Sequence, residues 1–236
     1  MNNNDIEKLY EEKALERRRV NLAYAENDVE FFDLGQTEID VGVKIGAGTY
    51  IGPGTIIKGD TVIGENCRIE QGTRIDNCEI GAGTTVDHSV LSDSKIGKET
   101  TIGPFAYIRP GSSIGDRCRI GDYVEIKNSG IGDDTKISHL SYVGDSDLGE
   151  GINIGCGVVF VNYDGWEKHR SVVEDGAFIG CNVNIVAPVR IGAGAYVAAG
   201  GTVTSDVEPG ALFVAREKGK SIVNWVARRG GLKKKR

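Results

Sequence analysis

The sequence predicts an all-β fold in which short parallel strands stack into a β-helix of hexapeptide repeats. Two observations support this prediction. An aliphatic residue recurs about every six positions from Ile39 to Val203, and glycine often follows it directly. A six-residue period is too short for a helical hairpin and does not match the period of an amphipathic helix. Repeats of this length are typical of β-solenoids, which bury one continuous core between neighbouring repeats.

Each repeat is expected to supply one strand and one bend, so that three repeats complete a triangular coil. Counting from Ile39 to Val203 gives about 28 repeats, or roughly nine coils. Some repeats shorten to five residues, as between Ile75 and Ile80, which predicts tighter corners. The glycine after the aliphatic residue is interpreted as giving each corner backbone freedom without a Cβ clash. The core is predicted to be a thin column of stacked isoleucine and valine.

Two segments outside the repeat predict short terminal helices. Residues 4–19 begin with an N-cap pattern, place apolar side chains on one face and end in a basic run, which favours an amphipathic helix. Residues 217–229 contain apolar residues suited to a second helix. Three parts are therefore expected: a helix and linker (1–38), the β-helix with a loop at 161–172 (39–207), and a C-terminal arm with a basic tail (208–236). The tail is interpreted as a solvated charge run, with help in holding an anionic cofactor as the alternative.

Composition and charge limit the kinds of partner and the cellular location that we expect for the chain. The net charge of −6 does not favour a nucleic-acid partner. No apolar run approaches the ~18 residues that span a bilayer, and the polar residues after Met1 do not resemble a signal peptide. We therefore expect a cytoplasmic protein without a membrane partner. The five cysteines are odd in number, widely spaced and never arranged as CxxC. We expect reduced thiols within the coils and no metal site.

The repeat is interrupted between Phe160 and Val173. The inserted residues include Trp166 and the basic residues Lys168 and His169. A rigid solenoid fixes the base of such a loop while its tip can close over a ligand. We therefore expect a functional loop and not a decorative one.

A set of motifs occurs in a fixed order along the repeat. They are Gly103–Gly111 (GPFAYIRPG), Val124–Lys127 (VEIK), Ser138–Asp145 (SHLSYVGD), Asn153–Gly157 (NIGCG), Asn162–Gly165 (NYDG), Gly176–Asn182 (GAFIGCN) and Val186–Val189 (VAPV). Together they resemble the C-terminal acetyltransferase domain of the bifunctional N-acetylglucosamine-1-phosphate uridyltransferase/glucosamine-1-phosphate acetyltransferase family, most strongly over residues 100–216. The resemblance implies a left-handed β-helix, although crossovers between parallel strands are usually right-handed.

The same resemblance implies an activity and an assembly. Members of that family pass an acetyl group from acetyl-CoA to the 2-amino group of glucosamine 1-phosphate, and they form homotrimers with sites between subunits. Their uridyltransferase domain precedes the β-helix, whereas this chain reaches its first repeat by Ile39. We therefore expect no uridyl transfer. A nucleotidyltransferase encoded separately could act beside the chain.

Acetyl transfer to an amino sugar phosphate needs a phosphate-binding group, a base for the amine proton and donors for the oxyanion. The resemblance assigns phosphate binding to Arg109 and Lys127, which the repeat places one coil apart on the same face. His139 is the expected general base, because an imidazole can accept a proton near neutral pH. By resemblance, further contacts to the sugar or ligand are assigned to Tyr142, Asn153, Asn162 and Lys168.

For acetyl-CoA, the resemblance points to six residues: Cys156, Asn162, Tyr163, Cys181, Ala199 and Arg216. The two cysteines are interpreted as small residues beside the pantetheine path and not as nucleophiles. Neither has an obvious activating base in the sequence, and direct transfer needs no acyl-enzyme. Arg216 and the basic tail could meet the CoA phosphates.

Three alternatives stay open. Another hexapeptide acyltransferase could act on a different amino sugar or an amino acid, and it would not need Arg109 and Lys127 together. A non-catalytic scaffold or regulatory protein could keep the fold without the reaction. A metal-dependent carbonic anhydrase on the same fold is least favoured, because it needs three histidine ligands. The histidines of this chain, His88, His139 and His169, include no closely spaced pair.

Overall fold

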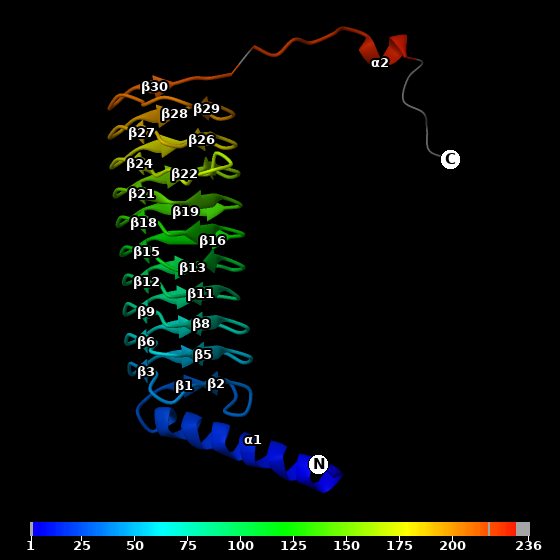
Figure 1. Ribbon diagram of the computed structural model, residues 1–236, viewed down its shortest axis with the longest axis vertical. Coiled ribbons are helices and arrows are strands. Elements are labelled where there is room, and N and C mark those ends of the chain that lie inside the picture. Colours follow the sequence, from blue (N-terminus) through cyan, green and yellow to red (C-terminus); the bar gives the residue numbers. More distant parts are fainter. Residues whose placement is uncertain (1, 217, 230–236) are drawn as a thin grey trace.

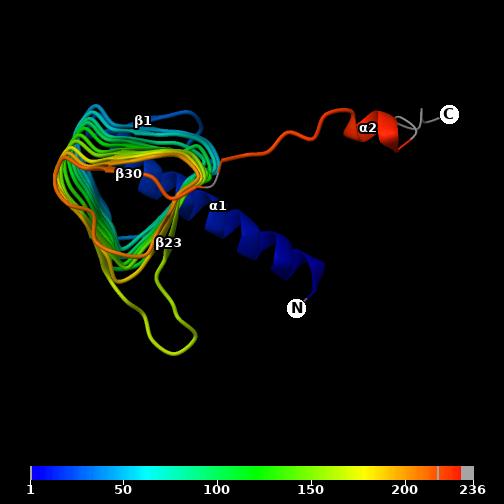
Figure 2. The same cartoon turned by 90° about the horizontal axis from the view of Figure 1, so that it is seen from above.

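A computed structural model describes residues 2–216 and 218–229, most of which form a column of stacked coils (Figure 1). Seen along its axis, the column is triangular, and a loop projects from it next to β23 (Val159–Val161) (Figure 2). α1 (Asn3–Ala25) extends away from one end of the column, and α2 (Trp225–Arg228) lies beyond the other end.

Among the described residues, the strands form three parallel sheets, here called sheets A, B and C, with 11, 10 and 9 strands. Sheet A contains β1 (Glu30–Phe31), β4 (Tyr50–Ile51), β7 (Arg68–Ile69), β10 (Thr85–Val86), β13 (Thr101–Ile102), β16 (Arg119–Asp122), β19 (Lys136–His139), β22 (Asn153–Ile154), β25 (Phe178–Ile179), β28 (Tyr196–Val197) and β30 (Leu212–Phe213). Sheet B contains β2 (Glu38–Ile39), β5 (Ile56–Lys58), β8 (Arg74–Asp76), β11 (Val90–Ser92), β14 (Tyr107–Ile108), β17 (Glu125–Lys127), β20 (Tyr142–Gly144), β23, β26 (Asn184–Val186) and β29 (Thr202–Val203). Sheet C contains β3 (Lys44–Ile45), β6 (Val62–Ile63), β9 (Glu79–Ile80), β12 (Lys95–Ile96), β15 (Ser113–Ile114), β18 (Gly130–Ile131), β21 (Ser146–Leu148), β24 (Ser171–Val173) and β27 (Arg190–Ile191).

The pairing register keeps the aliphatic residues of successive coils in line. Ile102 pairs with Ile120, Ile120 with Ile137, and Ile137 with Ile154, and all four side chains are buried. This confirms the predicted repeat and its aliphatic core. The column has about ten turns, one more than predicted. The difference arises because β1 and β30, which lie outside the span 39–207, extend the column by pairing with β4 and β28.

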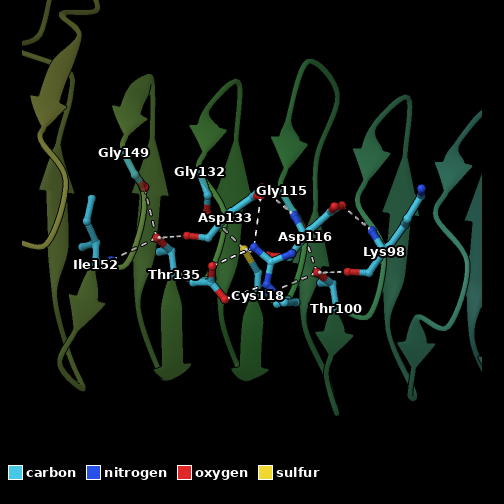
Figure 3. A network of polar contacts seen from close by, with 12 residues as sticks. Lys98, Thr100, Gly115, Asp116, Cys118, Gly132, Asp133, Thr135, Gly149 and Ile152 are labelled. Carbon is cyan, nitrogen blue, oxygen red and sulfur yellow. Dashed lines mark hydrogen bonds and ion pairs between the residues drawn. The ribbon is translucent and has the colours of Figure 1, made fainter.

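Buried hydroxyl groups complete the hydrogen bonds of the corners (Figure 3). The Thr100 hydroxyl donates to the Gly115 carbonyl at 2.8 Å and accepts from the Cys118 amide at 3.0 Å. Thr135 makes the equivalent two contacts two coils later. A buried backbone group without a partner is costly, so these contacts allow the corners to be buried.

The glycine that follows the aliphatic residue is required by the close approach of the next coil. Gly115 and Gly132 do not have a positive φ angle. A Cβ atom on Gly132 would lie 2.5 Å from the carbonyl carbon of Gly149 in the adjacent coil. The predicted avoidance of a Cβ clash is therefore confirmed at these positions, whereas the predicted need for backbone freedom is wrong there.

α1 is longer than the predicted helix at 4–19. It begins with a capping box, in which the Asn2 side chain accepts from the Asp5 amide at 2.9 Å. The basic run suggested an end, but the helix continues because its last turns contact the first coil. The side chain of Asn21 is buried there and donates to two backbone carbonyls. Ile6 of the predicted apolar face is exposed.

The C-terminal helix is shorter than predicted. α2 covers Trp225–Arg228 instead of 217–229, and residues 217 and 230–236, including the basic tail, lie outside the described part of the chain. Neither described helix combines the length and the apolar character needed to cross a bilayer.

We expect Gly132→Ala to lower the free energy of unfolding by about 1–3 kcal/mol, because the new methyl group would overlap backbone of the adjacent coil. Gly130→Ala, two residues earlier in β18, is the matched control. Its Cβ atom would meet only Asp147 Oδ1, at an ordinary contact distance of 3.5 Å. Urea unfolding measures both variants, and equal losses of stability would contradict the proposed role of coil spacing.

Candidate active site

One edge of the column, between sheets A and B, carries Asp122, His139, Cys156, Cys181 and Ala199. Each is the second residue after the inward-facing aliphatic residue of a sheet A strand. Asp122 and His139 are register partners, and backbone hydrogen bonds of 2.8 Å link the Cys156 and Cys181 carbonyls to the coils that follow them. We call these five residues the corner column. The predicted base and three predicted cofactor residues therefore lie in one line along the axis.

A carboxylate orients the predicted base. Asp122 Oδ1 lies 2.7 Å from His139 Nδ1, and both side chains are more than a third exposed. The hydrogen bond from His139 lowers the pKa of Asp122, so Asp122 stays an acceptor. With Nδ1 held by a carboxylate, Nε2 is the nitrogen left to accept a proton. The pair has the arrangement of a base and its orienting acid.

Three cationic side chains gather beside sheet B. Arg109 follows β14 and Lys127 ends β17, and the pairing of Ile108 with Ile126 places the two cations level on neighbouring coils. Lys168 reaches them from the inserted loop. The nearby Lys127 ammonium lowers the pKa of Lys168, and Arg109 acts in the same direction. The predicted phosphate-binding pair is thus brought together, and a third cation joins it.

Acidic groups hold the cations in place. Arg109 Nη1 lies 2.7 Å from Glu125 Oε1, and Lys127 Nζ lies 3.1 Å from Asp145 Oδ2. Asp145 is buried, which by itself raises its pKa. Hydrogen bonds from Asn128, Lys127 and Asn162 outweigh this and keep the pKa of Asp145 below its ordinary value.

Tyr142 and Asn162 lie next to Asp145, the acidic partner of Lys127. The Asn162 amide donates to Asp145 and, at 3.4 Å, to the Tyr142 hydroxyl. Gly144 leaves the space for this contact, because a Cβ atom there would lie 2.3 Å from the Tyr142 hydroxyl oxygen. The predicted sugar-contacting residues Tyr142 and Asn162 are therefore neighbours of the cation cluster of Arg109, Lys127 and Lys168.

The inserted loop between β23 and β24 is a compact hairpin. Tyr163 and Lys168 form an antiparallel bridge. The Asp164 carboxylate accepts from the amides of Glu167 and Trp166 and from His169 Nε2, each at 2.8 Å. These contacts, led by the Glu167 amide, lower the pKa of Asp164. The hairpin presents Lys168 to the cation cluster at a fixed position.

The other three predicted site residues, Asn153, Tyr163 and Arg216, do not lie together within one chain. Asn153 is on β22 of sheet A, beside Lys136 and Phe178, whereas the cation cluster lies on sheet B. Tyr163 is exposed on the hairpin, and its hydroxyl donates to a backbone carbonyl within it. Arg216 lies at the far end of the corner column, where Nη1 donates to the Ala199 carbonyl at 2.5 Å.

The three histidines lie on different coils and have separate aspartate partners. His88 Nδ1 lies 2.6 Å from Asp87, His139 contacts Asp122, and His169 contacts Asp164. They do not converge on one point. The geometry therefore does not favour the three-histidine metal site of the carbonic anhydrase alternative.

Asp122, Glu125 and Asp145 were not predicted from the sequence. Each contacts its basic partner across 16 to 18 residues, the length of one coil. A search for acidic residues one coil away from each candidate cation or base could have found them.

Comparison with known proteins relates this arrangement to a family. The bifunctional protein GlmU of Geobacillus sp. (strain WCH70) is 51% identical to the chain over 225 residues, and that of Clostridium beijerinckii is 49% identical over 222 residues. The chain is a homologue of part of these GlmU proteins. The two matches cover 95% and 94% of the chain, which spans about half (49%) of the length of each GlmU protein.

Other comparisons agree with the fold of this GlmU-related chain. Residues 34–109 match the family described as GMPPB C-terminal domain, and residues 93–128 match the bacterial transferase hexapeptide (six repeats) family. The crystal structure of LpxA from Bacteroides fragilis, a UDP-N-acetylglucosamine acyltransferase, is 21% identical to the chain. It aligns with a TM-score of 0.55 over 84% of this chain and 77% of that one. This likeness supports the β-helix fold.

Asp145→Asn is expected to reduce the loss of stability in acid. The pKa of Asp145 is lower in the folded chain than its ordinary value of about 3.9, so its carboxylate stabilises the fold above that value. This contribution disappears as the pH falls through the folded-state pKa. Urea unfolding at pH 6 and about pH 3 should show a smaller decrease for Asp145→Asn than for the wild type. Equal decreases would show that Asp145 does not contribute in this way.

Proposed function

We propose that the chain is a CoA-dependent acetyltransferase that acetylates the amino group of glucosamine 1-phosphate. The observation that carries this proposal is the oriented pair of His139 and Asp122, which stands at the corner where the sheet B strands begin, with a cluster of three cations where those strands end. Homology to GlmU proteins supports the choice of acceptor. Uridyl transfer is not part of the proposal.

The cation cluster would bind the phosphate of the acceptor. Arg109 offers a planar set of donors, whereas Lys127 and Lys168 offer compact positive charges. Glu125 and Asp145 hold two of these cations in place. The guanidinium and ammonium groups would keep further N–H donors for the phosphate oxygens. The neighbouring Tyr142 and Asn162 could then contact the sugar ring.

His139 would act as the general base of the transfer. As the amine nitrogen attacks the thioester carbonyl, His139 Nε2 takes its proton, the new C–N bond forms and the C–S bond breaks. The CoA thiolate leaves and is protonated. Asp122 keeps Nδ1 as the protonated nitrogen and stabilises the imidazolium that forms. No acyl-enzyme is needed, so Cys156 and Cys181 are not nucleophiles in this scheme.

The corner column would guide acetyl-CoA. Its thioester would lie at His139, its pantetheine arm would pass Cys156, Cys181 and Ala199, and its phosphates would meet Arg216. Asn162 and Tyr163 are further candidate cofactor contacts by homology. In a homotrimer, a neighbouring subunit could bring Asn153 to a site that one chain leaves open.

The two remaining alternatives differ in what they predict. An acyltransferase with another acceptor would release CoA thiol but would prefer an unphosphorylated substrate. A scaffold would release no CoA thiol with any amino sugar. A separate nucleotidyltransferase partner and a cytoplasmic location stay predictions.

Replacement of the base tests the reaction directly. With acetyl-CoA and glucosamine 1-phosphate, His139→Ala is expected to lower kcat by about 10²–10⁴, because it removes the proton acceptor. CoA thiol release measures the rate, and glucosamine without phosphate serves as the comparison acceptor. If the wild type released no thiol with any amino sugar 1-phosphate, the scaffold would replace the enzyme as the better proposal.

Lys168→Gln tests the cation cluster. We expect KM for glucosamine 1-phosphate to rise about tenfold or more with little change in kcat, since a hydrogen bond to a charged group contributes about 1.5–3 kcal/mol. Lys98→Gln, an exposed lysine at another corner, is the matched control. Steady-state kinetics with both acceptors measures the effect. An equal rise in KM for unphosphorylated glucosamine would argue against phosphate recognition.

A further inference from the structure

Cys156 and Cys181 occupy the same position of the corner column on neighbouring coils. Ile154 and Ile179, two residues before them, are register partners, and the Asn182 amide donates to the Cys156 carbonyl at 2.8 Å. Neighbouring strands lie about 4.8 Å apart. That separation is within the roughly 4.4–6.8 Å between Cα atoms that a disulfide bridges. The fold therefore sets side by side two thiols that the inserted loop separates in the sequence.

These two thiols differ from the other three, which belong to Cys67, Cys78 and Cys118. Those three side chains are buried, and burial raises the pKa of each thiol. The thiols of Cys67 and Cys118 also donate to backbone carbonyls at 3.2 Å. Cys156 and Cys181 are exposed. Buried thiols are inert, whereas accessible ones meet reagents from solution.

A base stands on the coil before Cys156. His139 has the same position in the corner column, and the Gly157 amide donates to the Leu140 carbonyl at 3.1 Å, which fixes the spacing of these two coils. Asp122 holds Nδ1 of His139 and leaves Nε2 to accept a thiol proton. Disulfide exchange requires a thiolate as the attacking group. The corner column thus provides an acid–base pair, an adjacent thiol and a second thiol one coil further on.

We propose that Cys156 and Cys181 are a redox-active dithiol, which small-molecule disulfides oxidise to an intramolecular disulfide that closes the corner column to the acyl donor. The Cys156 thiolate attacks one sulfur of the small disulfide, a protein–small-molecule disulfide forms, and the first small thiolate leaves. The Cys181 thiolate then attacks the Cys156 sulfur, the Cys156–Cys181 disulfide forms, and the second small thiolate leaves. The two cysteines lose two electrons, the small disulfide gains them, and the two protons go to the released thiolates.

The bridge has a consequence for the site. Backbone hydrogen bonds fix both coils, so the bridge cannot relax by moving them apart, and constrained disulfides are readily reduced. The bridged sulfur atoms would cover the surface between His139 and Ala199, where the pantetheine arm is proposed to run. This closure of the donor path rests on the proposed function, whereas the formation of the disulfide does not.

The first experiment tests the dithiol without measuring activity. The full chain is incubated with glutathione disulfide at neutral pH, free thiols are alkylated, and disulfide-linked peptides are mapped by mass spectrometry. We expect the number of free thiols to fall from five to three. One pair of disulfide-linked peptides should carry Cys156 and Cys181, and no glutathione should be retained. Dithiothreitol should restore both thiols.

Single-cysteine variants test whether each thiol resolves the mixed disulfide formed on the other. Cys156→Ser and Cys181→Ser should each retain one glutathione as a mixed disulfide, because the second thiol that expels it is missing. Cys118→Ser should still form the bridge. If the wild type retained glutathione on both cysteines, or if neither cysteine reacted, the dithiol would be ruled out.

The second experiment tests closure of the donor path. Binding of desulfo-CoA, which cannot exchange with disulfides, is measured by calorimetry before and after oxidation. We expect the wild type to lose desulfo-CoA binding on oxidation and to regain it with dithiothreitol. In Cys181→Ser, binding should be unchanged after the variant has been treated with the oxidant and the bound glutathione has been removed. Unchanged binding by the bridged protein would overturn the closure. If the bridge forms but the reduced protein neither binds desulfo-CoA nor releases thiol from acetyl-CoA, the proposed function fails and the dithiol stands.

Discussion

The rest of this structure depends on the registration of each coil on the next. Parallel backbone hydrogen bonds align strands one coil apart, buried hydroxyls such as that of Thr100 complete the corners, and glycines such as Gly132 let the coils touch. Because every coil repeats the same geometry, residues at equivalent positions form straight columns. A side chain is thus placed by its position in the repeat, and its partner is found one coil away.

The candidate active site uses this property twice. Along one corner, Asp122 and His139 form an oriented pair, and Cys156, Cys181 and Ala199 extend the line past them. Beside sheet B, Arg109 and Lys127 stand level on neighbouring coils, each held by an acidic residue. The hairpin adds what the repeat cannot supply, because it brings Lys168 to the cations from outside the coil.

The sequence was sufficient for those features that the period alone determines. The aliphatic core, the stacking of Arg109 with Lys127 and the site of the inserted loop all follow from counting repeats. The roles of Asp122 and Asp145 did not follow from counting. Shortened repeats reduce the offset between coils, which is 18 residues from Ile108 to Ile126 but 17 from Ile126 to Val143, and this hides which acidic residue meets which base. The length of α1 was missed because contacts of Asn21 with the first coil outweigh a local end signal.

The distinction between the two kinds of cysteine also needed the structure. In the sequence all five cysteines are isolated, and reduced thiols inside the coils were expected. In the structure, the position within the repeat determines the exposure of each thiol. Cys118 is buried beside a corner carbonyl, whereas Cys156 and Cys181 are exposed to solvent. A crystal structure of the chain with bound CoA tests the central claim most directly. The account predicts that the pantetheine arm follows the corner column with its sulfur at His139 and its phosphates at Arg216. CoA bound along sheet C, or with its sulfur far from His139, would contradict it.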